Sequence, residues 1–217
     1  MWLDVNIDID YHQQVQAAAN LNGLQIEAPS DFAMGKTNRS PEFLAKFPMG
    51  KVPAFAGTDG TNIFDSDAIA QYAAESGPAA GQLLGTTPAQ RAQIRQWICF
   101  GSSEVTDPVT QLMLWRVGLT AYNETAEKTA LARLERSLST LEGYLKGRTW
   151  VATNDKLSLA DISVAAGLRT GLALVIDADM RKKYPTTIEW YERTVETDGV
   201  KQAFGEKTYI EKRKESP

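Results

Sequence analysis

The first quarter of the chain changes its hydrophobic period several times. Residues 5–9 alternate apolar and polar side chains, which predicts a β-strand. Residues 13–22 carry small apolar residues at helical spacing and are followed by Gly23, a common residue just after a helix, so we expect a helix there. Residues 24–27 alternate again and predict a second short strand.

Residues 28–75 continue this mixture of loop, helix and strand patterns. Residues 28–39 have no periodicity and predict a loop. The run 38–55 indicates a short helix, a turn marked by glycine and a strand entered through Val-Pro. Residues 53–55 and 62–64 flank a glycine-containing turn and predict a hairpin, with a helix over 66–75. The predicted order is therefore β-α-β-α-β-β-α.

After a stretch rich in helix breakers at 76–81, the pattern becomes helical throughout. Pro88 lies at a first helical turn, and Pro108 is expected to kink or split the helix that begins there. Leucines recur at three- and four-residue steps from Leu131 to Leu145. They fit a buried bundle helix better than a coiled coil, because only about two heptads are present. The second half is predicted to be all-helical.

Residues 157–162, Leu-Ser-Leu-Ala-Asp-Ile, form a strong helix-start signal. Ser158 as the N-cap and Asp161 three residues later can exchange hydrogen bonds with each other's backbone. Leu157 and Ile162 can form a hydrophobic staple across the same turn. We expect a core helix to begin here.

Composition and charge exclude several classes of protein. Apolar residues make up 43% of the 217 positions and charged residues 23%, which is typical of a globular protein. A net charge of −4 without a basic stripe argues against direct nucleic-acid binding. No run of 18 apolar residues is present, so we expect no membrane span.

Cysteine and histidine are each present once. A single cysteine, Cys99, forms no internal disulfide and fits a reducing compartment, so we expect a cytoplasmic protein, with Cys99 buried in the core. A single histidine, His12, excludes a His-based metal site or a Ser-His-Asp triad elsewhere, and we expect no metal. Cys-x-x-Cys and phosphate-binding Gly-rich motifs are also absent, which argues against dithiol redox chemistry.

Two short motifs are candidates for ligand binding. Val52-Pro53, between a turn and a hairpin strand, is equally consistent with a cis peptide and with a trans proline on an edge strand. A cis bond would turn the backbone of Val52 outward, where an extended ligand can pair with it. Asp65-Ser66 lies at a strand-to-helix junction, where each residue is either an N-cap or part of an anion site.

Two segments resemble the glutathione-binding half of the glutathione transferase superfamily. They are residues 38–55, Asn-Arg-Ser-Pro-Glu-Phe-Leu-Ala-Lys-Phe-Pro-Met-Gly-Lys-Val-Pro-Ala-Phe, and residues 64–69, Phe-Asp-Ser-Asp-Ala-Ile. Within that superfamily, the sequence of these segments is specifically similar to the N-terminal domain of the translation elongation factor 1 gamma subunit. The resemblance implies an α/β, thioredoxin-like domain followed by an all-α bundle, usually in a homodimer.

On this resemblance we expect four segments. They are a thioredoxin-like glutathione-binding domain at 1–76, a linker at 77–87, an all-helical domain at 88–211 and a basic tail at 212–217.

The resemblance also implies roles for individual residues. Val52 would pair through its backbone with the cysteinyl part of glutathione, and Pro53 would be the cis proline. Asp65 and Ser66 would hold the γ-glutamyl end, and Lys51 would lie near the glycyl carboxylate. Glutathione would be a substrate rather than a bound cofactor.

The loop after the first strand departs from the family. Members usually have a Tyr- or Ser/Thr-containing loop there, which stabilises the glutathione thiolate. Here the stretch 8–12 is Asp-Ile-Asp-Tyr-His. Tyr11 and His12 are the candidate catalytic residues, and they are equally well explained as exposed residues at a helix start. Nearby aspartates oppose the positive potential that a thiolate needs.

Two functions follow from the resemblance. One is a cytosolic transferase that conjugates glutathione to a small electrophile near Met113, Trp115 and Tyr122, residues that also fit a helical core. The alternative is a non-catalytic domain that binds other subunits of the elongation factor 1 complex in translation. The chain length favours the enzyme, and the atypical first loop favours the interaction domain.

Overall fold

The N-terminal part of the molecule combines a small sheet with short helices. The computed structural model describes residues 12–215, so the predicted strand over 5–9 lies outside the described residues. The elements of this part are α1 (Gln13–Leu21), η1 (Thr37–Arg39), α2 (Pro41–Lys46), β1 (Ala54–Ala56), β2 (Asn62–Phe64), α3 (Ser66–Glu75) and α4 (Ala80–Leu84). Helix α4 falls in the stretch assigned to the linker, and the domain boundaries stay a prediction.

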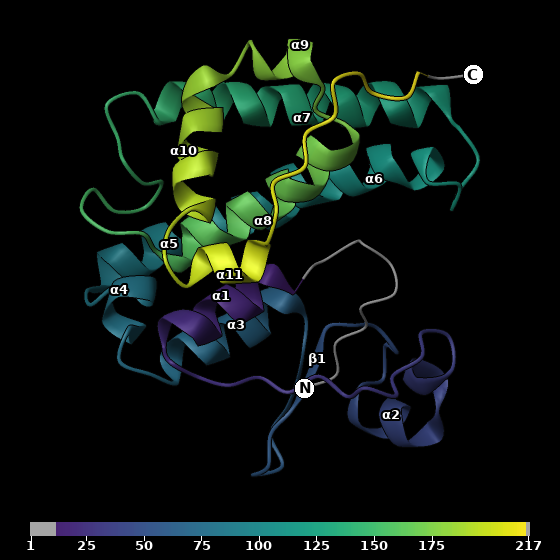
Figure 1. Ribbon diagram of the computed structural model, residues 1–217, viewed down its shortest axis with the longest axis vertical. Coiled ribbons are helices and arrows are strands. Elements are labelled where there is room, and N and C mark those ends of the chain that lie inside the picture. Colours follow the sequence, from purple (N-terminus) through teal and green to yellow (C-terminus); the bar gives the residue numbers. More distant parts are fainter. Residues whose placement is uncertain (1–11, 216–217) are drawn as a thin grey trace.

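The remainder of the described chain is helical, and one helix lies at its centre (Figure 1). Helix α8 contacts α5, η2, α6 and α10, and α1, α3 and α4 reach it from the N-terminal part. The elements are α5 (Pro88–Phe100), η2 (Gly101–Thr106), α6 (Asp107–Arg116), α7 (Glu124–Tyr144), α8 (Leu159–Leu174), α9 (Ala178–Arg181), α10 (Pro185–Val195) and α11 (Val200–Phe204).

The predicted hairpin is confirmed. Strands β1 and β2 pair antiparallel, with Ala54 opposite Phe64 and Ala56 opposite Asn62. The predicted strand over 24–27 is wrong: these residues form no strand. Their alternation does produce half-buried and exposed side chains in turn. A strand also needs a hydrogen-bonded neighbour, however, and within residues 12–215 β1 and β2 pair only with each other.

The helix that begins at Pro88 is interrupted before Pro108, as predicted. Helix α5 passes into the π-helical segment η2, and Pro108 is the second residue of α6. Proline has no backbone N–H and its ring collides with the carbonyl four residues earlier, so the regular hydrogen-bond ladder cannot continue through it. The wider π turn accommodates the change.

The predicted helix start at Ser158 is confirmed. The side chain of Asp161 accepts a hydrogen bond from the Ser158 backbone at 3.0 Å and another from its hydroxyl at 2.8 Å. The other carboxylate oxygen accepts from the Val151 backbone at 2.8 Å and from Trp190 Nε1 at 3.0 Å. Four donors from three segments therefore converge on one fully buried carboxylate.

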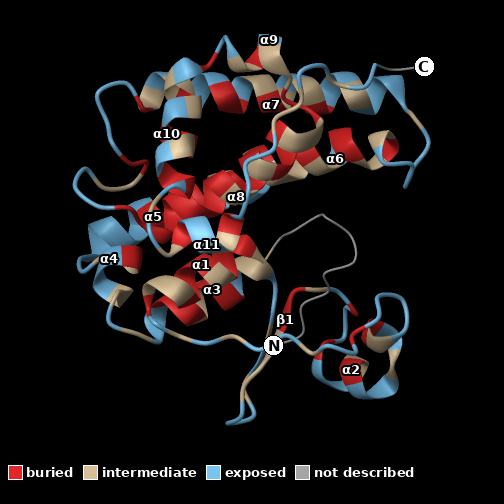
Figure 2. Ribbon diagram, in the orientation of Figure 1, coloured by how far each residue is buried: buried red, intermediate tan, exposed pale blue. Residues whose placement is uncertain are grey.

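Buried apolar residues form one large cluster that runs from α1 and α3 through the helical part (Figure 2). Four of the five leucines between Leu131 and Leu145 are buried on one face of α7, which confirms the bundle interpretation; Leu131 is half-buried. A separate small cluster under α2 contains Phe32, Phe43, Phe47 and Ala54. The loop before the hairpin therefore has a core of its own.

The expected burial of Cys99 is wrong, since its side chain is exposed. Trp97 and Ile98 turn into the core from the same helix. Successive helical residues point about 100° apart, so Trp97 and Ile98 share the buried face while Cys99 lies roughly 150° from its middle, on the solvent side.

Among the described helices none combines the length and the apolar character needed to cross a bilayer.

Replacing Asp161 with alanine should lower the free energy of unfolding by about 3 kcal/mol or more, because each buried donor left without an acceptor costs about 1–3 kcal/mol. Urea denaturation of the purified chain measures the change. Asp155→Ala is the matched control, because Asp155 is an exposed aspartate of the preceding loop and its loss should change stability by less than about 0.5 kcal/mol. Equal effects of the two substitutions would contradict the role given to Asp161.

Candidate functional site

The peptide between Val52 and Pro53 is cis, and it lies at one end of the hairpin. Ala54 pairs with Phe64 at that end, so the next residues outward are Pro53 on one strand and Asp65 on the other. The cis peptide and the first turn of α3 therefore lie side by side. The cis alternative left open by the sequence is confirmed.

The backbone of Val52 is available to a ligand. In the part of the chain that the structure describes, no residue forms a hydrogen bond with the N–H or C=O of Val52. Its side chain is half-buried and Pro53 is buried, so the segment is fixed in place. An extended peptide can add to such a backbone as a further strand.

The start of α3 separates the roles of two neighbouring residues. Asp65, with φ of 78°, is the N-cap, and its Oδ1 accepts from the backbone N–H groups of Asp67 at 3.0 Å and Ala68 at 3.4 Å. Ser66 is the first helical residue, and neither its N–H nor its hydroxyl bonds to a described residue. Because Asp65 alone caps the helix, Ser66 keeps two donors for an anionic group.

A buried asparagine holds the loop before the cis peptide. Asn38 donates from Nδ2 to the carbonyl of Gly50 at 2.6 Å and accepts at Oδ1 from the N–H of Gly35 at 2.6 Å. Gly50 has φ of 58°, and a Cβ there would lie 2.9 Å from the Asn38 carbonyl oxygen. Only glycine fits so close to the backbone of Asn38. The two hydrogen bonds of Asn38, here called the Asn38 clamp, set the direction in which Lys51 and Val52 leave the turn.

A hollow of about 280 Å³ opens next to this clamp. It contains two cationic side chains, Arg39 and Lys51, which are both exposed and form no ion pair with a described residue. Its lining residues are Met34, Gly35, Asn38, Arg39, Gly50, Lys51 and Val52. The predicted residues Lys51 and Val52 thus share one cavity, with positive charge at its exposed side.

The carboxylate of Asp67 links the site to both parts of the molecule. It accepts from Gln14 Nε2 of α1 at 3.0 Å and from the Ser102 hydroxyl of η2. Burial raises the pKa of this carboxyl above its ordinary value, and the two hydrogen bonds act in the opposite direction. The first turn of α3, which carries Ser66, is therefore tied to the helices on either side.

The candidate catalytic residues and the residues suggested to contact the electrophile lie in different parts of the chain. Tyr11 lies outside the described residues, and His12 is the half-buried N-cap residue of α1. Met113 and Trp115 are buried, and Tyr122 packs edge-on against Trp115 with ring centroids 5.2 Å apart. Met113 and Trp115 therefore belong to the buried core, whereas Tyr122 is a half-buried loop residue that packs on it.

Sequence reasoning missed three residues of the site. Asn38 and Arg39 lie in the run used to recognise the site, but the run does not reveal which side chain bonds the backbone of the turn. Asp67 follows the predicted Asp65-Ser66, and its partner Ser102 lies 35 residues further along the chain. No local pattern predicts such a contact. Within the described ranges no cluster of His, Cys, Asp and Glu side chains is suited to hold a metal ion.

Two family models match the chain. The model for the glutathione S-transferase N-terminal domain matches residues 11–75, and that for the glutathione S-transferase C-terminal domain matches residues 96–198. The chain is 48% identical over 198 residues to a glutathione S-transferase-like protein of Fusarium sp, covering 91% of this chain and 90% of that protein. It is 36% identical over 198 residues to human elongation factor 1-gamma, covering 90% of this chain and 44% of that longer protein.

Solved structures show the same fold. The GST-like domain of elongation factor 1-gamma from Saccharomyces cerevisiae superposes with a TM-score of 0.80 at 20% identity, covering 96% of each chain. The glutathione transferase URE2P6 from Phanerochaete chrysosporium, in complex with oxidized glutathione, gives a TM-score of 0.78 at 19% identity, over 88% of this chain and 89% of that one. The architecture is a thioredoxin-like N-terminal domain with a helical C-terminal domain.

The raised pKa of Asp67 makes a pH-dependent prediction. The ordinary value is 3.8, so a carboxyl with a raised folded-state pKa stabilises the fold below that value and loses this contribution as the pH rises through the folded-state pKa. Asp67→Asn is neutral at every pH and keeps an oxygen acceptor for Gln14. The stability of the wild type minus that of Asp67→Asn should therefore fall as the pH rises above 3.8.

Urea denaturation at several pH values measures this difference. Asp59→Asn is the control with the opposite sign, because hydrogen bonds from Thr61 lower the pKa of exposed Asp59. For that pair the difference should rise with pH. A flat or rising profile for Asp67 would contradict the assignment.

Proposed function

Because this chain belongs to the glutathione S-transferase family, we propose that it binds glutathione across the end of the β1–β2 hairpin and conjugates its thiol to small electrophiles. The single observation that carries the proposal is the register of the hairpin, which brings the cis peptide at Pro53 beside the open first turn of α3. Backbone groups and polar side chains then lie at the same end of the hairpin, where an extended tripeptide can contact both.

The γ-glutamyl end of glutathione carries both a carboxylate and an ammonium group. The free N–H and hydroxyl of Ser66 at the positive end of α3 suit the carboxylate. The second oxygen of Asp65, which is not used in capping the helix, suits the ammonium. The carboxylate of the ligand thus meets two hydrogen-bond donors of Ser66, and its ammonium group meets the negative charge of the adjacent Asp65.

The other two parts of the peptide fit the groups that follow along the chain. The cysteinyl amide pairs with the open N–H and C=O of Val52. The glycyl carboxylate lies in the hollow beside Lys51 and Arg39. Arg39 is an addition to the predicted set, and its planar guanidinium can hold a carboxylate through two hydrogen bonds.

The proposed reaction needs a thiolate. A donor from Tyr11 or His12, just before α1, stabilises the sulfur as its proton leaves to solvent. The thiolate then attacks an electrophilic carbon, forming a carbon–sulfur bond while the leaving group departs with the bonding electrons. No metal takes part. We also propose that the protein acts in the cytoplasm and as a homodimer, in keeping with the single cysteine and the family resemblance.

A second candidate is an interaction domain for elongation factor 1 subunits. The 36% identity to human elongation factor 1-gamma over nearly the whole chain favours it. The transferase proposal is preferred, because the chain is more similar to the Fusarium protein, at 48%, and spans 90% of it.

The binding proposal predicts that Ser66→Ala weakens glutathione binding about tenfold or more, because hydrogen bonds to a charged group contribute about 1.5–3 kcal/mol. Isothermal titration calorimetry with reduced glutathione measures the affinity. Ser76→Ala, at the other end of α3, is the matched control and should bind like the wild type. Failure of the wild type to bind millimolar glutathione would refute the proposal.

The catalytic proposal predicts a different result for the residues before α1. Tyr11→Phe or His12→Ala should reduce turnover of a chromogenic chloronitrobenzene at least tenfold, while glutathione affinity stays within about threefold. Removing a thiolate donor affects the reacting atom but leaves the proposed glutathione cradle, which comprises Arg39, Lys51, Val52, Asp65 and Ser66, intact. Steady-state kinetics and calorimetry on the same preparations give the two readouts. Glutathione binding without turnover by the wild type would favour the interaction domain.

A further inference from the structure

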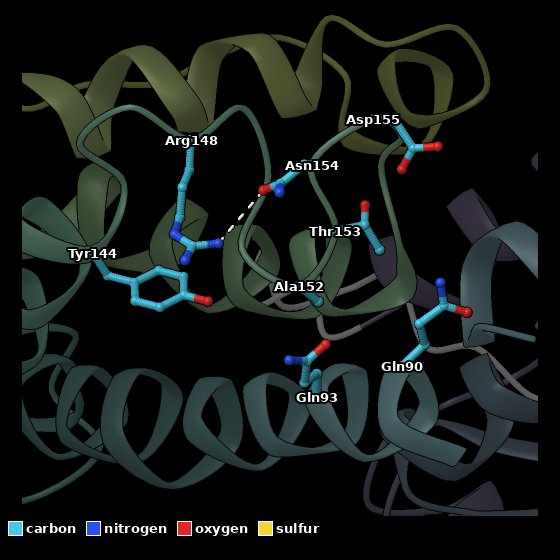
Figure 3. A pocket seen from close by; sticks show the side chains of 8 residues that line it. All are labelled: Gln90, Gln93, Tyr144, Arg148, Ala152, Thr153, Asn154 and Asp155. Atoms are coloured by element: carbon cyan, nitrogen blue, oxygen red, sulfur yellow. Dashed lines mark hydrogen bonds between the residues drawn. The ribbon is translucent and has the colours of Figure 1, made fainter. Parts of the chain in front are cut away.

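A polar hollow of about 270 Å³ lies between α5 and the loop that joins α7 to α8 (Figure 3). It shares no residue with the proposed glutathione site and belongs wholly to the helical part. Its lining residues are Gln90, Gln93, Tyr144, Arg148, Ala152, Thr153, Asn154 and Asp155.

The guanidinium of Arg148 is held in place by an aromatic stack. It lies 4.4 Å from the centre of the Tyr144 ring, and that ring in turn packs against buried Trp97 with centroids 4.6 Å apart. Stacking on an aromatic face restricts the rotamers of a long side chain. An anion that binds Arg148 therefore meets a preorganised group and loses less affinity to side-chain ordering.

Arg148 also has spare hydrogen-bonding capacity. Its guanidinium donates to Asn154 Oδ1 at a long 3.4 Å, and across residues 12–215 no carboxylate lies within ion-pair distance of it. A guanidinium has five N–H donors, so most of them face the solvent of the hollow. A second hollow, of about 330 Å³, shares Arg148 and Asn154 and adds Lys146. The shared wall is thus positively charged.

The opposite wall carries uncharged polar groups. Gln93 points from α5 toward the loop, and no described residue forms a hydrogen bond with its amide (Figure 3). The carbonyl oxygen of Gln90 is occupied by the N–H groups of Thr86 and Thr87, which leaves its NH₂ group toward the hollow. Such amides bind hydroxyl or amide groups of a ligand.

We propose that this hollow binds a small organic anion with a hydroxyl-rich body. The anionic group, a phosphate or a carboxylate, pairs with the planar guanidinium of Arg148, and the hydroxyl groups form hydrogen bonds with Gln93 and Gln90. Asp155, at the far end of the lining from Arg148 in Figure 3, repels ligands with a second negative charge there. The charge pattern of the wall therefore selects a single anionic group at the Arg148 end.

Calorimetric titration of the full chain with glucose 6-phosphate, gluconate and glucose tests the site. Glucose 6-phosphate and gluconate distinguish the phosphate from the carboxylate, and at least one of them should bind, whereas neutral glucose should not. Arg148→Ala should weaken the binding at least tenfold, and Gln93→Ala should weaken it about threefold.

The matched control is Arg136→Ala, which removes the same charge from an exposed arginine of α7 paired with Glu104. Its affinity should equal that of the wild type. Arg148→Lys keeps the charge and loses the planar fork, so it should remain at least threefold weaker than the wild type. Equal losses in Arg148→Ala and Arg136→Ala, or no binding of either anion at millimolar concentration, would overturn the proposal.

Discussion

The buried carboxylate of Asp161 fixes the start of α8, and both parts of the molecule are assembled on that helix. Its four donors come from Val151, Ser158 and Trp190, and thus from the preceding loop, the helix cap and α10. Burial raises the pKa of the carboxyl, while the donors favour its charged form. Because α1 and α3 also pack on α8, a shift of its first turn would move the elements that carry the proposed glutathione cradle.

Helix α3 is held at both ends by polar groups outside the cradle. Asp67 ties its first turn to α1 and η2. At the other end the amide of Asn22 donates to three carbonyls, and its oxygen accepts from the N–H of Ala79. The carbonyls belong to Ala18, Ala73 and Ala74. The orientation of half-buried Ser66 therefore depends on contacts between helices, which give it the precision that ligand binding requires.

The sequence predicts those features whose causes lie within a few residues. The hairpin at 53–64 and the capping box at 157–162 depend on neighbours in the chain, and both are confirmed. The strand at 24–27 fails because pairing needs a partner that alternation does not specify. The exposure of Cys99 and the bonds of Asp67 depend on which helices meet, which is decided by packing over the whole core.

The proposed cradle and the proposed thiol-activating group have different physical origins, so one fold can serve binding with or without catalysis. The cradle is built largely from backbone: the open edge at Val52, the first turn of α3 and the glycine turn held by Asn38. Backbone geometry survives most side-chain substitutions, provided that the register and caps remain. In the proposed reaction, activation of the thiol depends on single side chains before α1, where Tyr11 and His12 are near several aspartates in the sequence. Substitution there changes the chemistry without disturbing the cradle, so binding is the more robust of the two properties.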